Sequence, residues 1–452
     1  MVVSCSPPIN LTTTMIRRGV FLFAGLSVLS VPTVYAQDAG AISAADTAWM
    51  LMSTALVLLM TPALAFFYGG LVRAKNALNT MMMSFIALGI SALLWVALGY
   101  SLAFGEGNSF IGDLSMAFLS GVGLEGGGHG AYPHLLFMAF QGTFFIITAA
   151  LISGAVVERM RFSAYVIFIA VWGLLVYAPV AHWVWGGGWI ADLDALDFAG
   201  GAVVHVNAAA AAVVAALMLK PRKDYGRQAL LPHNVPFVLL GAGLLWFGWF
   251  GFNGGSALAA DGIAGLAFVN TMLAPGATLV LWAILDYVRN GHVTAVGTAT
   301  AIVVGLVAIT PAAGFVGPLS AILIGAIATF PSYFAIDWRA RSGFDDSLDV
   351  FAAHGVGGIT GAILTGVFAS TAWGSADGLI AGNAMQVAIQ ALSIIVVFVY
   401  SGGLTFAILK VINLVIPIRV ERKEEAYGMD VVNHGEQAYS TGEGAVLVRI
   451  ED

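Results

Sequence analysis

The sequence has little charge and almost no cysteine. Charged residues make up 10% of its 452 positions, whereas a soluble domain has roughly a quarter, so the composition excludes an ordinary soluble protein. The one cysteine, Cys5, excludes a disulfide framework and a cysteine-based metal site. Basic residues form no run that would indicate nucleic-acid binding. The net charge of −7 is less informative than the places where the charges lie.

The chain is instead rich in long apolar runs. Hydrophobic residues make up 59% of the chain, and the mean hydropathy is +0.91. A helix of about 20 residues crosses a hydrocarbon core of about 30 Å, and eleven runs are near that length. They predict an all-α polytopic membrane protein. The expected spans lie near 46–67, 79–103, 134–156, 162–184, 199–219, 234–252, 266–288, 293–310, 317–336, 350–369 and 385–416.

The N-terminus has the order of a secretory signal peptide over residues 1–36. Arg17 and Arg18 precede the apolar run GVFLFAGLSVLSV, and small residues lead to Ala36. Cleavage after Ala36 leaves a mature chain without cysteine and with its N-terminus outside. The alternative, a first transmembrane helix, is disfavoured because the apolar run is short.

Lysine and arginine follow only the odd-numbered spans. The connections after even-numbered spans, including the long loop 105–133, contain neither residue. Because cytoplasmic loops carry an excess of lysine and arginine, the pattern predicts the N-terminus outside and the C-terminus in the cytoplasm. The basic residues at or after odd-numbered spans are Arg73, Lys75, Arg159, Arg161, Lys220, Arg222, Lys223, Arg227, Arg289, Arg339, Arg341, Lys410, Arg419, Arg422, Lys423 and Arg449.

The C-terminal tail, residues 417–452, is polar and is expected in the cytoplasm. Its sequence ERKEEAYGMDVVNHGEQAYS allows two interpretations. One is a disordered tail, and the other is a regulatory or docking segment.

Two histidines lie well inside expected spans, His205 in 199–219 and His354 in 350–369. An ionisable side chain at membrane depth is costly and indicates a functional site. Either histidine alone could instead be bonded to a carbonyl of a neighbouring helix. Two histidines in corresponding spans favour a shared function.

The spans form two equal sets, one to five and six to ten, followed by one more. The second set therefore starts from the opposite face, as in an inverted five-plus-five repeat, whose binding sites lie near the membrane midplane. Asp197 precedes His205 by eight residues, and Asp349 precedes His354 by five. Because these spacings differ, we expect an approximate repeat.

Asp197 stands at the head of its expected helix. Its carboxylate can accept hydrogen bonds from the free N–H groups of Ala199, Gly200 or Gly201. We expect this capping to be its main role, and attraction of a cation from outside to be the second.

Aromatic residues gather towards the outer ends of the same spans, together with one hydroxyl. Most membrane aromatics are packing or interface anchors. A cage of rings also suits a small cation, because cation–π attraction reaches about 2 kcal/mol when desolvated. The candidate cage and its neighbours are Phe140, Phe144, Trp185, Phe252 and Ser256.

Six motifs occur in order: FYGGLVRAKN, AFQGTFF, VWGGG, DFAGGAVVHVNAA, GWFGFNGGS and DVFAAHGVGG. With them, nearly the whole mature chain resembles the ammonium transporter family (Amt/MEP, related to Rhesus proteins). Trp185 and Ser256 make it more similar to bacterial Amt proteins than to Rhesus proteins. The resemblance implies an eleven-helix transporter domain over 37–416, a homotrimer with one pore per subunit, no cofactor and no enzymatic activity.

The resemblance also implies roles for individual residues. His205 and His354 would be the twin histidines of the pore, and Asp197 would support the outer site. The site that recruits ammonium would consist of Phe140, Phe144, Trp185 and Ser256. Phe144 and Phe252 would form the gate. The segment GMDVVNHGEQAY is similar to the family's C-terminal tail, against which a PII-type signal protein can dock.

The expected function is transport of ammonium or ammonia across the cell inner membrane for nitrogen uptake, with methylammonium as an analogue. Ammonium would lose water and a proton on the way to neutral histidines. Two alternatives belong to other classes. Twin histidines could ligate a haem, although the ring-lined entrance argues against it. The protein could also be an ammonium sensor that signals through its tail, although no output domain follows the tail.

Overall fold

The computed structural model describes residues 42–439. Over this range it contains helices, turns and loops and no β-strand. Among the described residues, ten helices are long and apolar enough to cross a membrane, and the shorter apolar α11 (Ala295–Ile309) is an eleventh candidate. The prediction of an all-α, multi-pass membrane protein is confirmed. The expected signal peptide, residues 1–36, lies outside the described residues.

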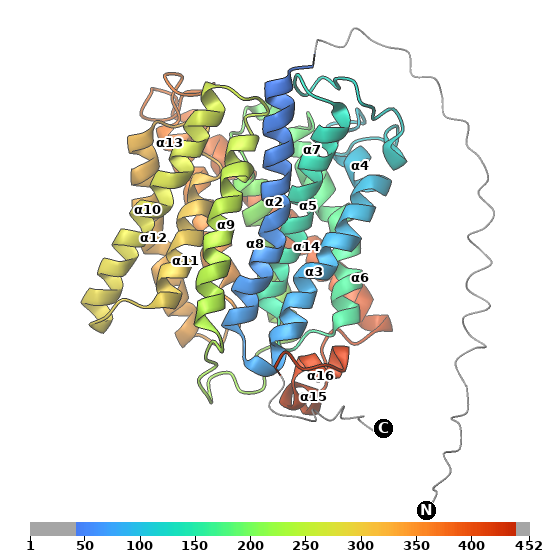
Figure 1. Ribbon diagram of the computed structural model, residues 1–452, viewed down its shortest axis with the longest axis vertical. Helices are drawn as coiled ribbons and strands as arrows, with labels where there is room; N and C mark the ends of the chain where they lie inside the picture. The colour runs from blue at the N-terminus through green and yellow to red at the C-terminus, as the bar shows by residue number, and fades with distance from the viewer. Residues whose placement is uncertain (1–41, 440–452) are drawn as a thin grey trace, which may run out of the picture. The chain divides into compact units, whose positions relative to one another are not determined.

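The helices agree closely with the expected spans, and several of them contain π-helical turns. η3 (Trp95–Gly99) joins α3 to α4, and η5 (Gly173–Tyr177) joins α6 to α7. In chain order the spans are α2 (Ala44–Leu71), α3 and α4 (Ala77–Leu94, Tyr100–Phe104), α5 (His134–Val156), α6 and α7 (Phe162–Trp172, Ala178–Trp185), η7 and α8 (Gly201–Val206, Asn207–Leu219), α9 (Val235–Gly255), α10 (Gly262–Asn290), α11, α12 (Pro318–Arg341), η8 and α13 (Phe351–Val356, Gly357–Phe368) and α14 (Met385–Val415) (Figure 1).

The first helices of the two predicted sets, α2 and α9, pack against each other. Small residues let them approach closely. A Cβ added to Gly241 would lie 2.4 Å from the backbone nitrogen of Phe67, and one added to Gly70 would lie 2.6 Å from the carbonyl oxygen of Asn234. The last spans of the two sets also meet, because η7 contacts η8 and α13. This pairing of corresponding helices fits the five-plus-five repeat.

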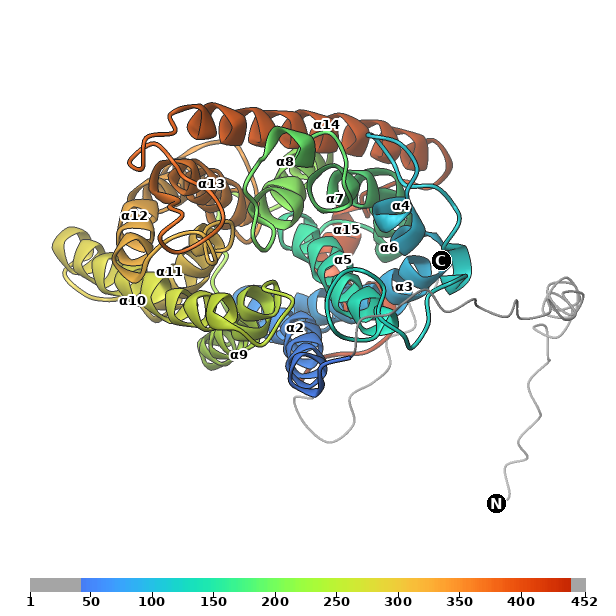
Figure 2. The same cartoon turned by 90° about the horizontal axis from the view of Figure 1, so that it is seen from above.

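The helix α14 lies outside the two sets. In Figure 2 it runs along one edge of the helical unit, and it contacts α6, α8 and α13. It therefore packs against members of both sets. The side chain of Gln390 on α14 accepts from the N–H of Leu196 and donates to its carbonyl, both at 2.7 Å. These bonds fix the chain just before Asp197.

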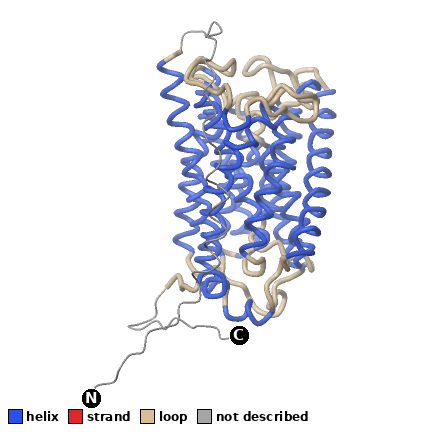
Figure 3. The backbone as a smooth tube through the Cα atoms, turned by 90° about the vertical axis from the view of Figure 1, so that its right-hand side faces the viewer, coloured by secondary structure: helices blue, strands red, loops and turns tan. Residues whose placement is uncertain are grey.

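Loops gather at the two ends of the helical unit (Figure 3). We call the end that carries loop 105–133 the loop face, and the end that carries the short helices α15 (Arg422–Tyr427) and α16 (Met429–His434) the tail face. On the tail face, the Asp430 carboxylate accepts from the N–H groups of Leu78 and Asn79 at 3.1 and 2.7 Å, capping the start of α3. The interpretation of the tail as disordered is therefore wrong for residues 422–434.

Buried charges join four connections on the tail face. Glu158 pairs with Arg73 at 3.1 Å and with Arg222 at 2.9 Å, and Arg222 also pairs with Asp345 at 2.7 Å. Burial alone would raise the pKa of Glu158, but the guanidinium groups of Arg222 and Arg73 hold it below its ordinary value. This network ties together the connections that follow α2, α5, α8 and α12.

Candidate functional site

The two histidines singled out from the sequence meet in the interior of the helical unit. His205 lies in η7 and His354 in η8, and both are buried. Their Nδ1 atoms are 3.2 Å apart, and their ring centroids are 5.2 Å apart. A neutral imidazole has one donor and one acceptor nitrogen, so one ring donates to the other. The Nε2 atom of His205 has no hydrogen-bond partner among the described residues.

The spacing of this pair suits proton exchange and not a shared metal. Two imidazole nitrogens on opposite sides of one metal ion stand about 4 Å apart, because each bond is about 2.0 Å long. The 3.2 Å between the Nδ1 atoms of His205 and His354 is the length of a direct hydrogen bond. Within residues 42–439, no cluster of three or more His, Cys, Asp or Glu side chains could hold a metal ion. The geometry therefore argues against the haem alternative.

Both histidines lie in π-helical turns that begin their spans. Such turns are rare and occur mostly at functional sites. Gly200 has φ of 115° just before η7, a left-handed conformation that glycine adopts readily. A Cβ added to Gly358 would lie 3.1 Å from the Cβ of His205. Glycine thus permits the sharp entry into η7 and the close crossing of the two histidine-bearing spans.

Asp197 caps the η7 turn with both carboxylate oxygens. Oδ1 accepts from the N–H groups of Gly200 and Gly201, and Oδ2 accepts from those of Ala202 and Val203, at 2.5–3.1 Å. Ala199, one of the three expected partners, is not among them. Burial raises the pKa of the Asp197 carboxyl above its ordinary value, and the four N–H groups oppose that rise.

A second capping aspartate, which the sequence analysis missed, begins the η8 turn. Asp346 precedes His354 by eight residues, the spacing that separates Asp197 from His205. Its Oδ2 accepts from the N–H of Phe351 at 2.7 Å. Asp349, the residue paired with His354 in the sequence analysis, has a different role, because its carboxylate is bound by a guanidinium. The repeat is therefore more regular than expected, and the equal spacing was the signal that could have shown it.

Aromatic side chains cover the histidine pair on the loop-face side. The Phe144 ring lies 5.0 Å from Phe140 and 5.8 Å from Trp185, centroid to centroid. The indole N–H of Trp185 donates to the carbonyl of Asp197 at 2.8 Å, so the capping residue also orients this ring. The Ser256 hydroxyl, at the end of α9, donates to the carbonyl of Phe252 at 2.8 Å. Its oxygen remains an acceptor.

Stacked rings continue from this cage to the histidines. Phe144 and Phe252 stack with centroids 4.2 Å apart, and Phe252 lies 6.1 Å from the His205 ring. Beside them is a cavity of about 10 Å³ lined by apolar side chains and both histidines, which is about the space that one water-sized molecule needs. The rings therefore separate the loop face from the histidine pair.

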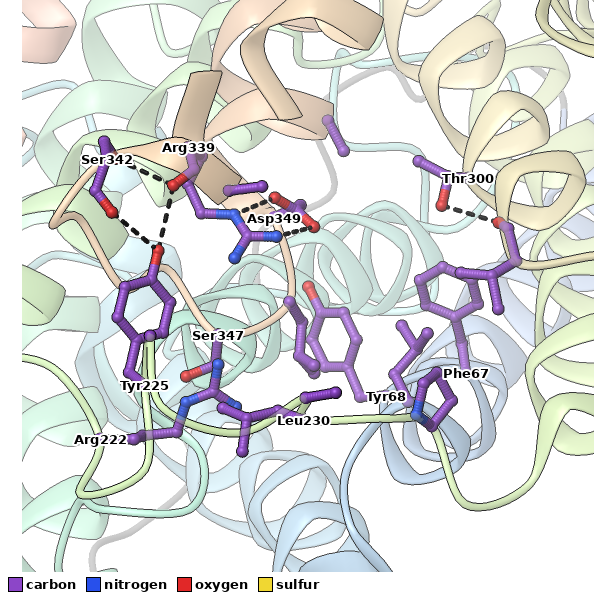
Figure 4. Close-up of a pocket in the computed structure, with 18 of the residues that line it drawn as sticks. Phe67, Tyr68, Arg222, Tyr225, Leu230, Thr300, Arg339, Ser342, Ser347 and Asp349 are labelled. Atoms are coloured by element: carbon purple, nitrogen blue, oxygen red, sulfur yellow. Dashed lines mark hydrogen bonds and ion pairs between the residues drawn. The ribbon is translucent and has the colours of Figure 1, made fainter. Parts of the chain in front are cut away.

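On the tail-face side, His354 borders a vestibule of about 570 Å³. Figure 4 shows its wall, with Phe67 and Tyr68 from α2 across from Arg339 and Asp349. The Arg339 guanidinium donates two hydrogen bonds to the Asp349 carboxylate, at 2.6 and 2.9 Å. The histidine pair is thus closed towards the loop face and open towards the tail face.

Phe67 is a further residue beside the histidine pair that the sequence analysis missed. It lines the small cavity together with Phe252. The two rings occupy equivalent positions in the two sets, because α2 ends with Phe-Tyr-Gly-Gly (67–70) and α9 with Phe-Asn-Gly-Gly (252–255). This repeated Phe-x-Gly-Gly pattern could have identified Phe67.

Comparisons with known proteins agree over most of the chain. A sequence model of the Ammonium Transporter Family matches residues 48–439. The ammonium transporter of Bacillus subtilis (strain 168) is 48% identical over 398 residues, covering 87% of this chain and 98% of that protein. The structure of Saccharomyces cerevisiae Mep2 is 35% identical with a TM-score of 0.78, covering 84% of this chain and 88% of that one. A structure described as Sensor Amt Protein is 31% identical with a TM-score of 0.80, covering 86% of this chain and 98% of that one.

Proposed function

Because this chain belongs to the ammonium transporter family, we propose that it transports ammonium through the pore that contains His205 and His354. Its relatives are named as transporters, so it is a transporter and not an enzyme. The proposed path past the two histidines rests on one observation. The two Nδ1 atoms are 3.2 Å apart, between a ring-covered entrance and an open vestibule.

Ammonium is recruited on the loop face. The rings of Phe140, Phe144 and Trp185 replace part of its water shell with cation–π contacts, worth about 2 kcal/mol when desolvated. The Ser256 oxygen accepts a hydrogen bond from it. Asp197 acts indirectly, since its oxygens are engaged by backbone N–H groups and its carbonyl orients Trp185.

The stacked Phe144 and Phe252 form the gate. An apolar passage penalises a hydrated ion, so a substrate that can leave its proton behind passes more readily than one that cannot. Beyond the gate, the hydrogen-bonded pair His205 and His354 offers donor and acceptor nitrogens to ammonia and to a transferred proton. Potassium has no proton to give up and no N–H to donate, so it is excluded.

The setting is a cell membrane, with the tail face in the cytoplasm. The buried arginines of the tail-face connections and the basic residues of the tail support this orientation, while loop 105–133 has none. Large apolar side chains exposed along α10 and α12, such as Val280 and Phe330, contact lipid or a neighbouring subunit. Extending the family resemblance, we assign the chain to the inner membrane as a homotrimer, with the tail face available to a PII-type signal protein.

Uptake of radiolabelled methylammonium into a transporter-deficient strain tests the proposal. We expect saturable uptake that ammonium inhibits and potassium does not. Purified protein in liposomes is the control for indirect effects of the host cell. Absence of uptake in both systems, with the protein present in the membrane, would contradict the proposal.

Ammonium sensing is the second candidate, favoured by the likeness to the structure described as Sensor Amt Protein and by the tail helices docked on the tail face. A sensor would bind ammonium with little net flux. The liposome assay separates the two, because saturable binding without uptake indicates sensing alone.

A further inference from the structure

The two capping aspartates are satisfied very differently. Each oxygen of Asp197 accepts from two N–H groups. Asp346 Oδ2 accepts from Phe351, whereas Asp346 Oδ1 is buried without a hydrogen-bond partner among residues 42–439. The side chain as a whole is only 1% exposed. A buried carboxylate oxygen with no donor is unusual in a folded protein.

The cationic and hydroxyl groups near Asp346 make their hydrogen bonds to other residues, although the Nε atom of Arg159 has no partner among residues 42–439. Arg339, on α12, is bound to the Asp349 carboxylate. Arg159, on the α5–α6 connection, donates to Ser347 and to the carbonyl of Asp345. Tyr68, on α2, donates to the carbonyl of Leu151. Asp346 therefore has no cation of its own and has the like charge of Asp349 nearby.

The tail-face vestibule comes close to this carboxylate along the chain. The residues that follow it, Ser347, Leu348 and Asp349, line the vestibule, as does Tyr68. Burial and the charge of Asp349 raise the pKa of Asp346 to about 6. Its protonation state therefore changes between about pH 5 and about pH 7, and its Oδ2 bonds to the first residue of the turn that carries His354.

We propose that Asp346 is a positioning residue for transport: while ionised it holds the η8 turn that presents His354 to His205, and its protonation from the tail face loosens that turn and slows transport. This rests on the function proposed above for the histidine pair. An ionised carboxylate is attracted by the N-terminal dipole of a helix and accepts from its N–H groups. The neutral acid loses that attraction and gains an O–H that must find an acceptor.

The sign of the effect follows from the raised pKa. The folded protein binds a proton at Asp346 more readily than the unfolded chain does, so the ionised group lowers folding stability as pH rises from about 4 through about 6. Keeping this residue ionised at neutral pH therefore costs overall stability, because the desolvation of the buried charge outweighs what its hydrogen bond to the η8 turn contributes. Removing the charge should stabilise the fold at neutral pH and abolish the pH response of transport.

Methylammonium transport into liposomes tests the proposal, because this amine stays cationic at pH 5.5–7.5. Between about pH 7.5 and about pH 5.5 the ionised fraction of Asp346 falls from about 0.97 to about 0.24, so wild-type transport should fall about fourfold. Asp346→Asn keeps an acceptor oxygen for Phe351 but does not titrate, and its transport should be nearly constant. Asp197→Asn, at the other cap, is the matched control for pH dependence: it should lower transport at every pH but keep the wild-type fourfold fall between the two pH values.

Thermal unfolding gives a second measurement that does not need transport. The unfolding midpoint of the wild type, relative to Asp346→Asn, should fall as pH rises from about 5 to about 7. A difference that is constant with pH, or an Asp346→Asn variant that keeps the fourfold fall in transport, would overturn the proposal. If the wild type transports nothing at any pH, the proposed function fails and the slowing of transport fails with it. The unfolding comparison then still decides whether Asp346 titrates.

Discussion

The loop-face half and the tail-face half of the proposed pore are built on the same pattern but are filled differently. Each half has a capping aspartate eight residues before a histidine and a phenylalanine from a Phe-x-Gly-Gly helix end. On the loop face, rings in contact at 4.2–5.8 Å close the path to His205. On the tail face, a vestibule of about 570 Å³ reaches His354.

In the function proposed above, this difference separates the selection of a cation from its release. A cation that arrives from the loop face must exchange its water for aromatic faces before it meets the histidines. A molecule that leaves towards the tail face enters a space already wide enough for water and edged by charged groups. Substitutions in the loop-face half should therefore change which ions are transported, and equivalent substitutions in the tail-face half should change the rate or its pH dependence.

The largest expected effect is at the histidine pair, where the two halves meet. His205→Ala or His354→Ala should lower selective ammonium uptake by at least about 100-fold, the lower end of what a positioned proton-transfer group contributes. Uptake at matched protein levels measures this. His182→Asn is the control, because His182 is equally buried but bonds to Ala103 and Asn108 away from the pore. Normal selective uptake in both alanine variants would show that the pair only packs.

Asp197 should give the next largest effect. Asp197→Ala leaves four buried N–H groups without an acceptor, and each costs about 1–3 kcal/mol, more than the roughly 0.5–2 kcal/mol of a simple cap. Asp197→Asn keeps one acceptor oxygen and so two of the four bonds, and should lie between wild type and alanine. Thermal unfolding and methylammonium uptake should fall together in this order. A stable but inactive Asn variant would instead assign the main role to the charge.

Trp185→Leu should weaken apparent ammonium affinity about tenfold, equal to about 1.4 kcal/mol of the cation–π contribution. Leucine keeps bulk against Phe144 but has no ring face and no N–H for the Asp197 carbonyl. The half-saturating concentration for uptake measures the effect. Wild-type affinity and selectivity in this variant would remove Trp185 from the recruitment site.

Phe67→Leu should give the smallest effect, about twofold in uptake rate, because leucine keeps apolar bulk on the cavity wall and the proposed tail-face half does not select ions. Phe252→Leu, at the equivalent position of the loop-face half, is its matched partner and should admit competing cations. Potassium inhibition of methylammonium uptake compares the two. If both variants lost selectivity against potassium equally, both halves would select ions. The proposed division between a selecting loop-face half and a releasing tail-face half would then be wrong.

Hydropathy predicted the spans well because membrane helices need long apolar runs whatever their local winding. The expected start and end of 134–156 agree with α5 to the residue. The π-helical turns could not be predicted in this way, since one extra residue per turn leaves the apolar pattern almost unchanged. His205 and His354 could be found because charge at membrane depth is rare.

Residues in the connections were harder to assign from sequence. Asp349 was chosen as the partner of His354, but Asp345, Asp346 and Asp349 are all within five residues, and composition does not separate them. Their roles depend on long-range partners, since Asp345 binds Arg222 and Asp349 binds Arg339. Only the eight-residue spacing marks Asp346.

The cap on α3 has a consequence for synthesis. The N–H groups of Leu78 and Asn79 are satisfied by Asp430, 351 residues later than Asn79. At about 5–20 residues per second, the ribosome needs roughly 20–70 s to reach Asp430 after it has made α3. The helix α3 is therefore synthesised well before its capping residue. In a chain that stops before Asp430, the N–H groups of Leu78 and Asn79 lack this acceptor.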